Sequence, residues 1–279
     1  MNKNLKELYR FLDNDIGFED ITTRALIQPD LKIKAKILSN KRGIVAGLDL
    51  VSSFISEFDI NITEIKEDGI ELNPGDTVLA LEGDAETILT IERTVLNLLM
   101  RMSGIATVTS QMVKKARSKN HNVIIAGTRK TTPGLQFFEK QAIKIGGGDT
   151  HRYRLDDAVL IKDNHLALVG DVVLAVKKAR EYASFTKKIE IEVENQEDAI
   201  NAAEAGADII LLDNMQVEDV ESVLKALKDI NLRDKIIIEI SGGIDLDNIV
   251  EYAKTGVDVI SSGYITHSAG VLDMSLEIQ

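Results

Sequence analysis

Six short runs of mainly aliphatic and β-branched residues recur after about residue 104, and segments with helical periodicity separate them. The runs are Asn122–Ala126, Ala158–Ile161, Ile189–Val193, Asp208–Leu212, Lys235–Ile240 and Val257–Ser261. This alternation predicts βα units whose strands form a parallel sheet, either open or closed into a barrel. Six units are two fewer than a complete (β/α) barrel contains.

The first 104 residues mix strands and helices without this regular order. Alternating apolar positions predict strands at Lys32–Ser39, Ile62–Ile65 and Val78–Leu81, and a turn signal lies at 73–76. A long segment with helical periodicity begins at Glu86. We therefore predict a small α+β domain ahead of the βα units.

Polar residues or glycines follow each predicted strand of the second part. In a barrel, the carboxyl ends of the strands form the face where active-site loops meet, and in an open sheet they line a crevice. Residues that are far apart in the sequence are therefore predicted to line one site. They are Thr128-Arg129-Lys130, Lys162-Asp163-Asn164, Glu192, Asp213-Asn214, Ser241-Gly242-Gly243 and Ser262-Gly263.

Lysines and arginines are concentrated between Thr128 and His165, although the net charge of the chain is −12. An acidic chain is a poor general partner for nucleic acid or for an anionic membrane. A local group of cations therefore predicts a site for an anionic ligand. The cations of this stretch are Arg129, Lys130, Lys140, Lys144, Arg152, Arg154 and Lys162.

The chain has no cysteine, which excludes disulfides and thiolate chemistry and fits a reducing compartment. The first twelve residues have the pattern of an amphipathic helix, unlike a signal peptide. The sequence contains no apolar run near the roughly 20 residues that span a bilayer. We predict a cytoplasmic protein.

Two groups of small residues at neighbouring strand ends, Ser241-Gly242-Gly243 and Ser262-Gly263, predict loops whose backbone N–H groups hold a phosphate. Tight βα turns are the simpler explanation of either group alone. Glu192 and Asp213 fit two roles, namely pairing with the nearby cations and holding Mg²⁺ together with substrate phosphates. From the residues alone we predict an enzyme that binds a phosphorylated, Mg²⁺-associated substrate beside a second, carboxylate-bearing one.

Ordered motifs along essentially the whole chain resemble those of the quinolinate phosphoribosyltransferases, also called carboxylating nicotinate-nucleotide pyrophosphorylases. The resemblance implies an N-terminal α/β sandwich domain over 1–104 and an incomplete α/β barrel over 105–268. A C-terminal tail over 269–279 is expected to return to the N-terminal domain. The motifs are Asp15–Thr23, Glu92–Asn97, Ser103–Thr107, Thr128–His165, Glu190–Glu194, Leu212–Asn214, Ser241–Ile244 and Thr266–Ser268.

The resemblance also implies a reaction of NAD biosynthesis, in which quinolinate and phosphoribosyl pyrophosphate, with Mg²⁺, give nicotinate mononucleotide, pyrophosphate and CO₂. Catalytic roles fall to Lys130, Lys162, Glu192 and Asp213, and the last two are the implied metal ligands. The implied contacts to quinolinate are Arg129, His151, Arg152 and Lys162. Those to phosphoribosyl pyrophosphate are Lys130, Lys140, Glu192, Asp213, Ser241, Gly242, Gly243, Ser262 and Gly263.

A homo-oligomer, at least a homodimer, is implied as well, with Arg93 reaching the site of a neighbouring subunit. Several positions depart from the commoner family pattern without removing an implied catalytic residue: Gly127, Gln136, Thr150 and Tyr153-Arg154. These residues can change the exact placement of side chains at the site, but not the identity of the implied catalytic residues.

Three alternatives stay open on the sequence. One is a related pyrophosphorylase-like protein linked to molybdenum transport, although Lys162 within Ile161–His165 favours the quinolinate enzyme. The second is a Schiff-base lyase or aldolase that uses Lys162 at a strand end. The third is an anion sensor without catalytic activity.

Overall fold

The computed structural model describes residues 3–279, which form two compact units. The first contains residues 3–108, 137–146 and 269–279, and the second contains residues 109–136 and 147–268. The sequence places residues 137–146 in the second domain, whereas in the structure they belong to the first compact unit. The reason is helix α5 (Gln136–Ile145), whose Phe138 ring lies 5.8 Å from the ring of Phe11 and whose buried Glu139 pairs with Arg101.

An antiparallel sheet with the strand order β12-β1-β5-β3 forms the centre of the first unit. The C-terminal strand pairs with β1, so the last residues of the chain lie in this unit. The strands predicted from the first 104 residues are present. The elements of this unit are α1 (Lys3–Ile16), α2 (Ile21–Leu26), β1 (Lys32–Ser39), β2 (Gly43–Ile44), α3 (Leu48–Ile55), β3 (Ile60–Ile65), β4 (Glu71–Leu72), β5 (Thr77–Asp84) and β12 (Met274–Ile278).

Helix α4 (Ala85–Arg117) follows β5, and its long periodic pattern is that predicted from Glu86 onward. The side chain of Asp84 accepts hydrogen bonds from the backbone N–H and the hydroxyl of Thr87, which caps the start of the helix. Of the helices in residues 3–279, none has both the length and the apolar character to cross a membrane.

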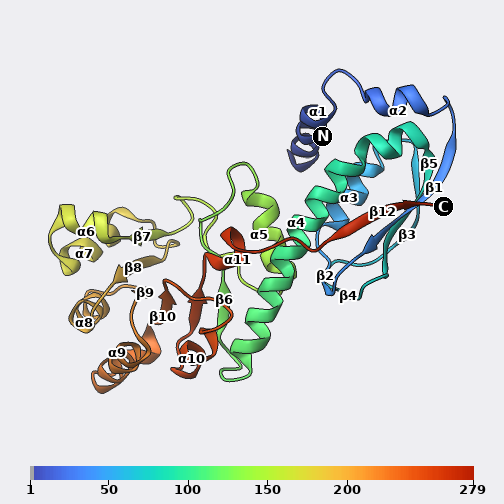
Figure 1. The fold of residues 1–279 in the computed structure, drawn as a ribbon. Coiled ribbons are helices and arrows are strands. Elements are labelled where there is room, and N and C mark those ends of the chain that lie inside the picture. Colours follow the sequence, from blue (N-terminus) through green and yellow to red (C-terminus); the bar gives the residue numbers. More distant parts are fainter. Residues whose placement is uncertain (1–2) are drawn as a thin grey trace. The chain divides into compact units, whose positions relative to one another are not determined.

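The second unit contains a parallel sheet with the strand order β6-β11-β10-β9-β8-β7. All six predicted βα strands are present, and Figure 1 shows helices α7, α8 and α9 along one side of the sheet. In the described residues β6 and β7 are the outer strands, so the sheet is an incomplete barrel. The strands are β6 (Ile124–Ala126), β7 (Val159–Ile161), β8 (Ile189–Val193), β9 (Ile209–Asp213), β10 (Ile237–Ser241) and β11 (Val259–Ser261).

The remaining helices of this unit connect the strands. They are α6 (Asp163–Val169), α7 (Val172–Tyr182), α8 (Gln196–Glu204), α9 (Val217–Asp229), the 3₁₀ turn η1 (Arg233–Lys235), α10 (Ile249–Lys254) and α11 (Tyr264–His267).

Side chains alternate between the two faces of each strand, and this places acidic residues on one inner face of the sheet. In β8, Ile189 and Ile191 are fully buried under the helices, whereas Glu190 and Glu192 point to the opposite face. The register aligns Glu192 with Leu211 of β9, and Leu211 with Glu239 of β10. Four further inner-face positions follow from the same register: Leu160, Ile209, Asp213 and Ser241.

Two aspartates repeat one hydrogen-bonding pattern at the amino ends of the strands. Asp208 precedes β9, accepts a hydrogen bond from the backbone N–H of Ile189 in β8 and pairs with Arg180 at 2.7 Å. Asp258 precedes β11, accepts from the backbone N–H of Ile238 in β10 and pairs with Arg233 at 3.0 Å. Each aspartate therefore ties its own strand to the neighbouring one.

Replacing Asp258 by asparagine should lower the free energy of unfolding by about 1–2 kcal/mol, because the charge that Arg233 binds is lost. Urea denaturation of the variant measures this loss. Asp234→Asn is the matched control, since Asp234 is a neighbouring exposed aspartate. Equal stability of the two variants would contradict a tying role for Asp258.

Candidate active site

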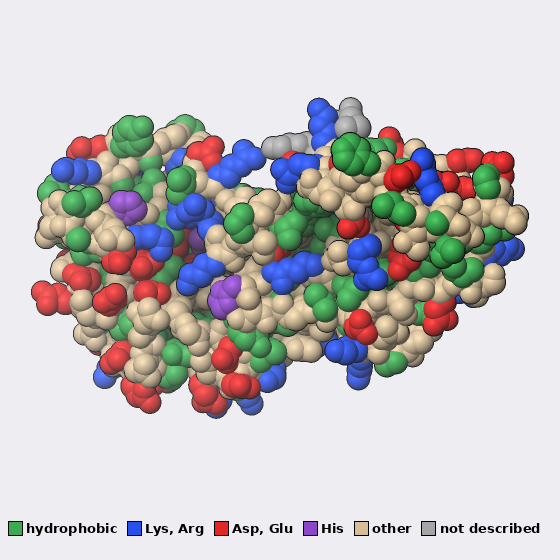
Figure 2. Space-filling view, turned by 45° about the horizontal axis from the view of Figure 1, so that its top comes forward, with side chains coloured by type: hydrophobic (Ala, Val, Ile, Leu, Met, Phe, Trp, Pro, Cys, Tyr) green, Lys and Arg blue, Asp and Glu red, His purple; other side chains and the backbone are tan. Residues whose placement is uncertain are grey.

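A cavity of about 520 Å³ lies at the carboxyl ends of the strands of the second unit. Figure 2 shows basic side chains and a histidine close together on this part of the surface, among acidic ones. Eleven residues that the sequence assigns to a site line this cavity. They are Thr128, Arg129, Lys130, His151, Arg152, Lys162, Asp163, Asn164, Glu192, Asp213 and Ser241.

Lys162 and Glu192 form an ion pair inside this cavity. The Lys162 Nζ atom lies 2.6 Å from Glu192 Oε2, and the lysine side chain keeps 44% of its exposure. The backbone N–H of Lys162 donates a hydrogen bond to Nδ1 of His165 at 2.9 Å, at the start of α6. His165 therefore caps the start of α6, and Lys162 is held at a defined place with its ammonium group accessible.

Asp213 is the last residue of β9, and this strand is the neighbour of β8, which contains Glu192. Burial raises the pKa of Asp213, the charge of Glu192 raises it further, and Lys162 and Lys130 act in the opposite direction. Two carboxylates thus repel one another at neighbouring strand ends. Oxygen ligands of this kind fit a divalent cation such as Mg²⁺, which would relieve the repulsion.

Arg152 and Arg129 contribute two guanidinium groups to the lining of the same cavity. Burial lowers the pKa of Arg152, and the nearby charge of Arg129 lowers it further. Two mutually repelling guanidinium groups bind an anion with two carboxylates well, because each can form paired hydrogen bonds with one of them.

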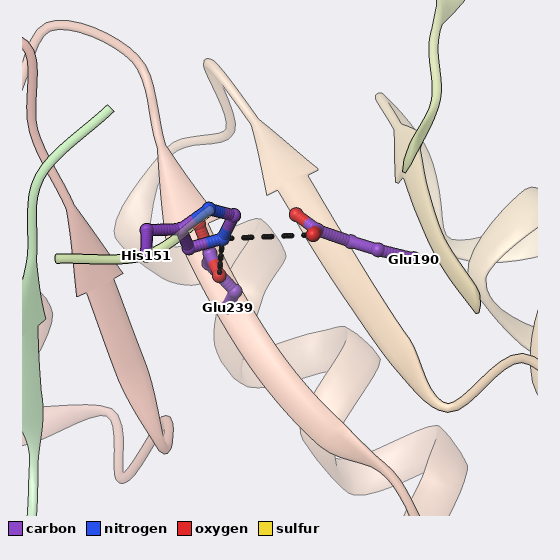
Figure 3. Close-up of side chains that lie close together, drawn as sticks. All are labelled: His151, Glu190 and Glu239. Atoms are coloured by element: carbon purple, nitrogen blue, oxygen red, sulfur yellow. Dashed lines mark hydrogen bonds and ion pairs between the residues drawn. The ribbon is translucent and has the colours of Figure 1, made fainter. Parts of the chain in front are cut away.

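His151 lies against two buried carboxylates, as Figure 3 shows. Its Nε2 atom is 3.3 Å from Glu239 Oε2 and 3.5 Å from Glu190 Oε2. Burial alone would lower the pKa of His151, but the hydrogen bonds and charges of the two glutamates outweigh it and raise the pKa from 6.5 to about 10. Burial also raises the pKa of Glu190. His151 is therefore an imidazolium at neutral pH.

Sequence reasoning missed Glu190 and Glu239 as site residues. Their signal is a charged residue at an alternating position inside an otherwise aliphatic strand, as in Ile189-Glu190-Ile191. Such a residue faces the side opposite to the buried aliphatic ones. The two glutamates are 1% and 2% exposed, and both line the large cavity.

A second, smaller cavity of about 150 Å³ contains the glycine loops. Gly242 and Gly243 have φ values of 96° and 60°, which favour glycine. A Cβ atom on Gly242 would lie 2.2 Å from Asn214 Oδ1, so this loop also requires glycine for space. Lys130 and Ser241 line both cavities, which makes the two neighbours.

The smaller cavity also contains His267, for which the sequence offered no independent signal. The other residues that line it with Lys130 and Ser241 are Gly242, Gly243, Ile244, Asp245, Ser262, Gly263 and Tyr264. The predicted phosphate-binding residues are therefore collected in one place.

Two predicted site residues belong to the first unit. Lys140 lies on α5, is fully buried and is not among the residues that line either cavity. Arg93 lies on α4, its side chain is 58% exposed, and it is 3.7 Å from Glu92. Together with Asp15, Glu19 and other residues, it lines a separate surface cavity of about 350 Å³. The roles implied for Lys140 and Arg93 stay predictions.

Comparisons with known proteins identify the family of this chain. Residues 20–103 match the N-terminal domain of quinolinate phosphoribosyl transferase, and residues 105–277 match its C-terminal domain. The "Probable nicotinate-nucleotide pyrophosphorylase [carboxylating]" of Methanothermobacter thermautotrophicus is 57% identical over 265 residues, which cover 95% of each chain.

The human "Nicotinate-nucleotide pyrophosphorylase [carboxylating]" is 38% identical over 245 residues, 88% of this chain and 82% of its own. The crystal structure of NadC from Streptococcus pyogenes superimposes with a TM-score of 0.92 at 38% identity, covering 98% of this chain and 95% of that one. The resemblance seen in the sequence motifs is confirmed, and the chain belongs to the quinolinate phosphoribosyltransferase family.

Proposed function

We propose that this protein is a carboxylating nicotinate-nucleotide pyrophosphorylase. It transfers the phosphoribosyl group of phosphoribosyl pyrophosphate to quinolinate, and nicotinate mononucleotide, pyrophosphate and CO₂ are the products. One observation carries the proposal. A cavity with two guanidinium groups, an imidazolium and a lysine adjoins a second one built from glycine loops. The family supplies the reaction that needs both.

The cationic part of the large cavity suits a planar pyridine dicarboxylate. Arg129 and Arg152 bind its carboxylates, and the charged His151 adds a third donor. Lys162 lies where these residues meet the acidic strand ends. The four residues together compensate the two negative charges of quinolinate.

The smaller cavity suits the 5′-phosphate of the second substrate. Backbone N–H groups of the loops at Gly242, Gly243 and Gly263 are free of side chains that would block a phosphate. Lys130 lines both cavities, so it lies between the 5′-phosphate and the reacting groups. Its ammonium group then stabilises the negative charge that develops on the leaving pyrophosphate.

Glu192 and Asp213 are the residues that would hold Mg²⁺, because two carboxylates at neighbouring strand ends offer the oxygen ligands that this ion prefers. When bound, the ion neutralises charge on the pyrophosphate and so favours its departure. The same two carboxylates face the positive charge that develops on the ribose as the C1–O bond breaks. The Lys162 ammonium, 2.6 Å from Glu192, limits the repulsion between them.

Bond making and breaking then proceed without an organic cofactor. The pyridine nitrogen forms the bond to C1 of the ribose while pyrophosphate leaves with the C1–O electron pair. The alkylated ring carries a positive charge beside the 2-carboxylate, so the carbon–carbon bond breaks, CO₂ leaves, and C2 keeps the electron pair and takes up a proton. The protein contributes position and charge compensation for these steps.

We further propose that the protein works in the cytoplasm as a homo-oligomer, at least a homodimer. The exposed side chain of Arg93 supports a contact with a neighbouring subunit. Lys140 is proposed to act toward the pyrophosphate group.

A comparison of quinolinate with nicotinate as the acceptor tests the function. Purified protein with phosphoribosyl pyrophosphate and Mg²⁺ should form nicotinate mononucleotide from quinolinate and release one CO₂ per product. Nicotinate should be a poor acceptor, because it lacks the second carboxylate that the paired guanidinium groups bind. Product by chromatography and CO₂ from labelled quinolinate are the two measurements.

Preference for nicotinate without CO₂ release would contradict the proposed substrate. A borohydride-trapped adduct on Lys162 with a carbonyl substrate would instead support the Schiff-base alternative. Tight quinolinate binding without turnover would support the anion sensor.

A further inference from the structure

Glu190 and Glu239 have no role in the reaction proposed above, yet they are buried in its cavity. One oxygen of each, Oε1, has no hydrogen-bond partner among the residues that the structure describes. Buried carboxylates are costly unless they are paired, and removing them from a core often leaves stability unchanged or increases it. The stability of the fold alone therefore does not explain why two of them meet at one histidine.

The orientation of His151 is defined from two sides. Its Nε2 atom faces both glutamates, and Figure 3 shows the carboxylates directed at this nitrogen from two different strands. The backbone of His151 has φ 50°, a value that is rare for residues other than glycine, and its N–H donates to Asp149 Oδ1 at 2.6 Å. The polar contacts of the ring with Glu190 and Glu239 are both made through Nε2, and this leaves Nδ1, the other ring nitrogen, outside them. It is the atom left for a ligand.

We propose that Glu239 and Glu190 are positioning residues that act through His151. They hold the imidazole by its Nε2–H and so present Nδ1–H to a carboxylate of the bound substrate. This proposal rests on the proposed function, because it assigns that carboxylate to quinolinate.

The chemistry of imidazole explains why two acids assist in binding an anion. In the neutral ring with the proton on Nε2, the lone pair of Nδ1 would repel a carboxylate. In the imidazolium both nitrogens are donors. The glutamates keep the ring charged, since its pKa lies near 10 instead of 6.5.

The charged groups around His151 come from two strands and from its own segment of the chain. Glu190 belongs to β8, Glu239 belongs to β10, and Asp149 and Arg152 lie on its own segment. The two glutamates contact the ring itself, whereas Asp149 contacts only the backbone N–H. Removing one glutamate should therefore lower the pKa of His151 toward its ordinary value.

The test is the KM for quinolinate of Glu239→Gln at two pH values, with phosphoribosyl pyrophosphate saturating. At pH 8.5 the KM should rise roughly ten- to a hundredfold. This is the effect expected when the one hydrogen bond from His151 to the charged carboxylate is lost. At pH 6 the rise should be less than about threefold, because the histidine takes up its proton without help near its ordinary pKa. The KM for phosphoribosyl pyrophosphate should stay unchanged at both pH values.

Glu194→Gln is the matched control, since Glu194 is an exposed glutamate that directly follows the same strand as Glu190. A histidine NMR titration without ligand gives a second readout, with the His151 signal assigned through His151→Asn. Native His151 should stay charged to beyond pH 8.5, and in Glu239→Gln it should titrate at lower pH. If Glu239→Gln does not fold, Glu190→Gln provides the same comparison.

A KM increase of equal size at both pH values would overturn the proposal, because loss of structure alone does not recover at low pH. So would titration of native His151 near pH 6.5. If the native protein forms no product from quinolinate, the proposed function fails and this inference fails with it. Product formation by the native enzyme with an unaffected Glu239→Gln variant would overturn the inference alone.

Discussion

Replacing Lys162 by alanine is expected to lower kcat for nicotinate mononucleotide formation by roughly a thousandfold, the upper range for one removed charge-stabilising donor. The Lys162 Nζ atom lies 2.6 Å from Glu192 Oε2 in the large cavity. Without it, the Glu192 carboxylate loses its nearest positive charge and repels Asp213 and the incoming dicarboxylate more strongly. Steady-state product formation at saturating substrates measures the loss.

Lys254→Ala is the matched control for this prediction. The Lys254 side chain is 48% exposed against 44% for Lys162, and it also pairs with a glutamate, Glu251 at 2.8 Å. It lies on α10, and it lines neither cavity. A Lys162→Ala enzyme that keeps more than a tenth of native kcat would remove Lys162 from the catalytic residues. Normal thermal unfolding of the variant would exclude misfolding as the cause.

Replacing Gly242 by alanine is expected to raise the KM for phosphoribosyl pyrophosphate by roughly a hundredfold, as displacements near 1 Å can do. The new Cβ atom would lie 2.2 Å from Asn214 Oδ1 and 2.8 Å from the Asn214 backbone nitrogen. Asn214 cannot move freely, because its backbone N–H donates to Ser241 O at 2.9 Å and its side chain donates to Asp213. The loop itself must therefore shift, and its N–H groups leave the phosphate.

Gly206→Ala separates backbone strain from this effect on the site. Gly206 has φ 88°, close to the 96° of Gly242, but a Cβ atom there would meet nothing within 4 Å. Both variants should lose a similar free energy from the left-handed backbone, about 1 kcal/mol. Only Gly242→Ala should change the KM for phosphoribosyl pyrophosphate. Equal KM values for the two variants would show that the glycine loop does not bind this substrate.

The residues that form the strands and those that follow them could be predicted from the sequence. The six βα strands appear within a few residues of the expected places. The reason is that the pattern of aliphatic residues is contained in each short segment and does not depend on the rest of the chain. The same local pattern predicts that Lys162, Glu192 and Asp213 belong to one site. Parallel strands end at one edge, so the residues that follow them must meet there.

Other features depend on which strands become neighbours and at which register. Glu190 and Glu239 are 49 positions apart in the sequence, and only the alignment of β8, β9 and β10 brings both against His151. The left-handed backbone of His151 then turns its ring toward them. Local periodicity indicates that an acid faces inward, but it contains no information on the partner that the acid meets.

Helix α5 also combines a feature that the local sequence predicts with one that only tertiary contacts determine. Its periodic pattern predicts a helix, while its membership in the first unit follows from the aromatic contact of Phe138 with Phe11 and from the pairing of Glu139 with Arg101. Local pattern thus decided the elements and the chemistry at the strand ends of this protein. Tertiary packing decided which charges are paired, because the burial that shifts a pKa exists only once distant segments exclude water together.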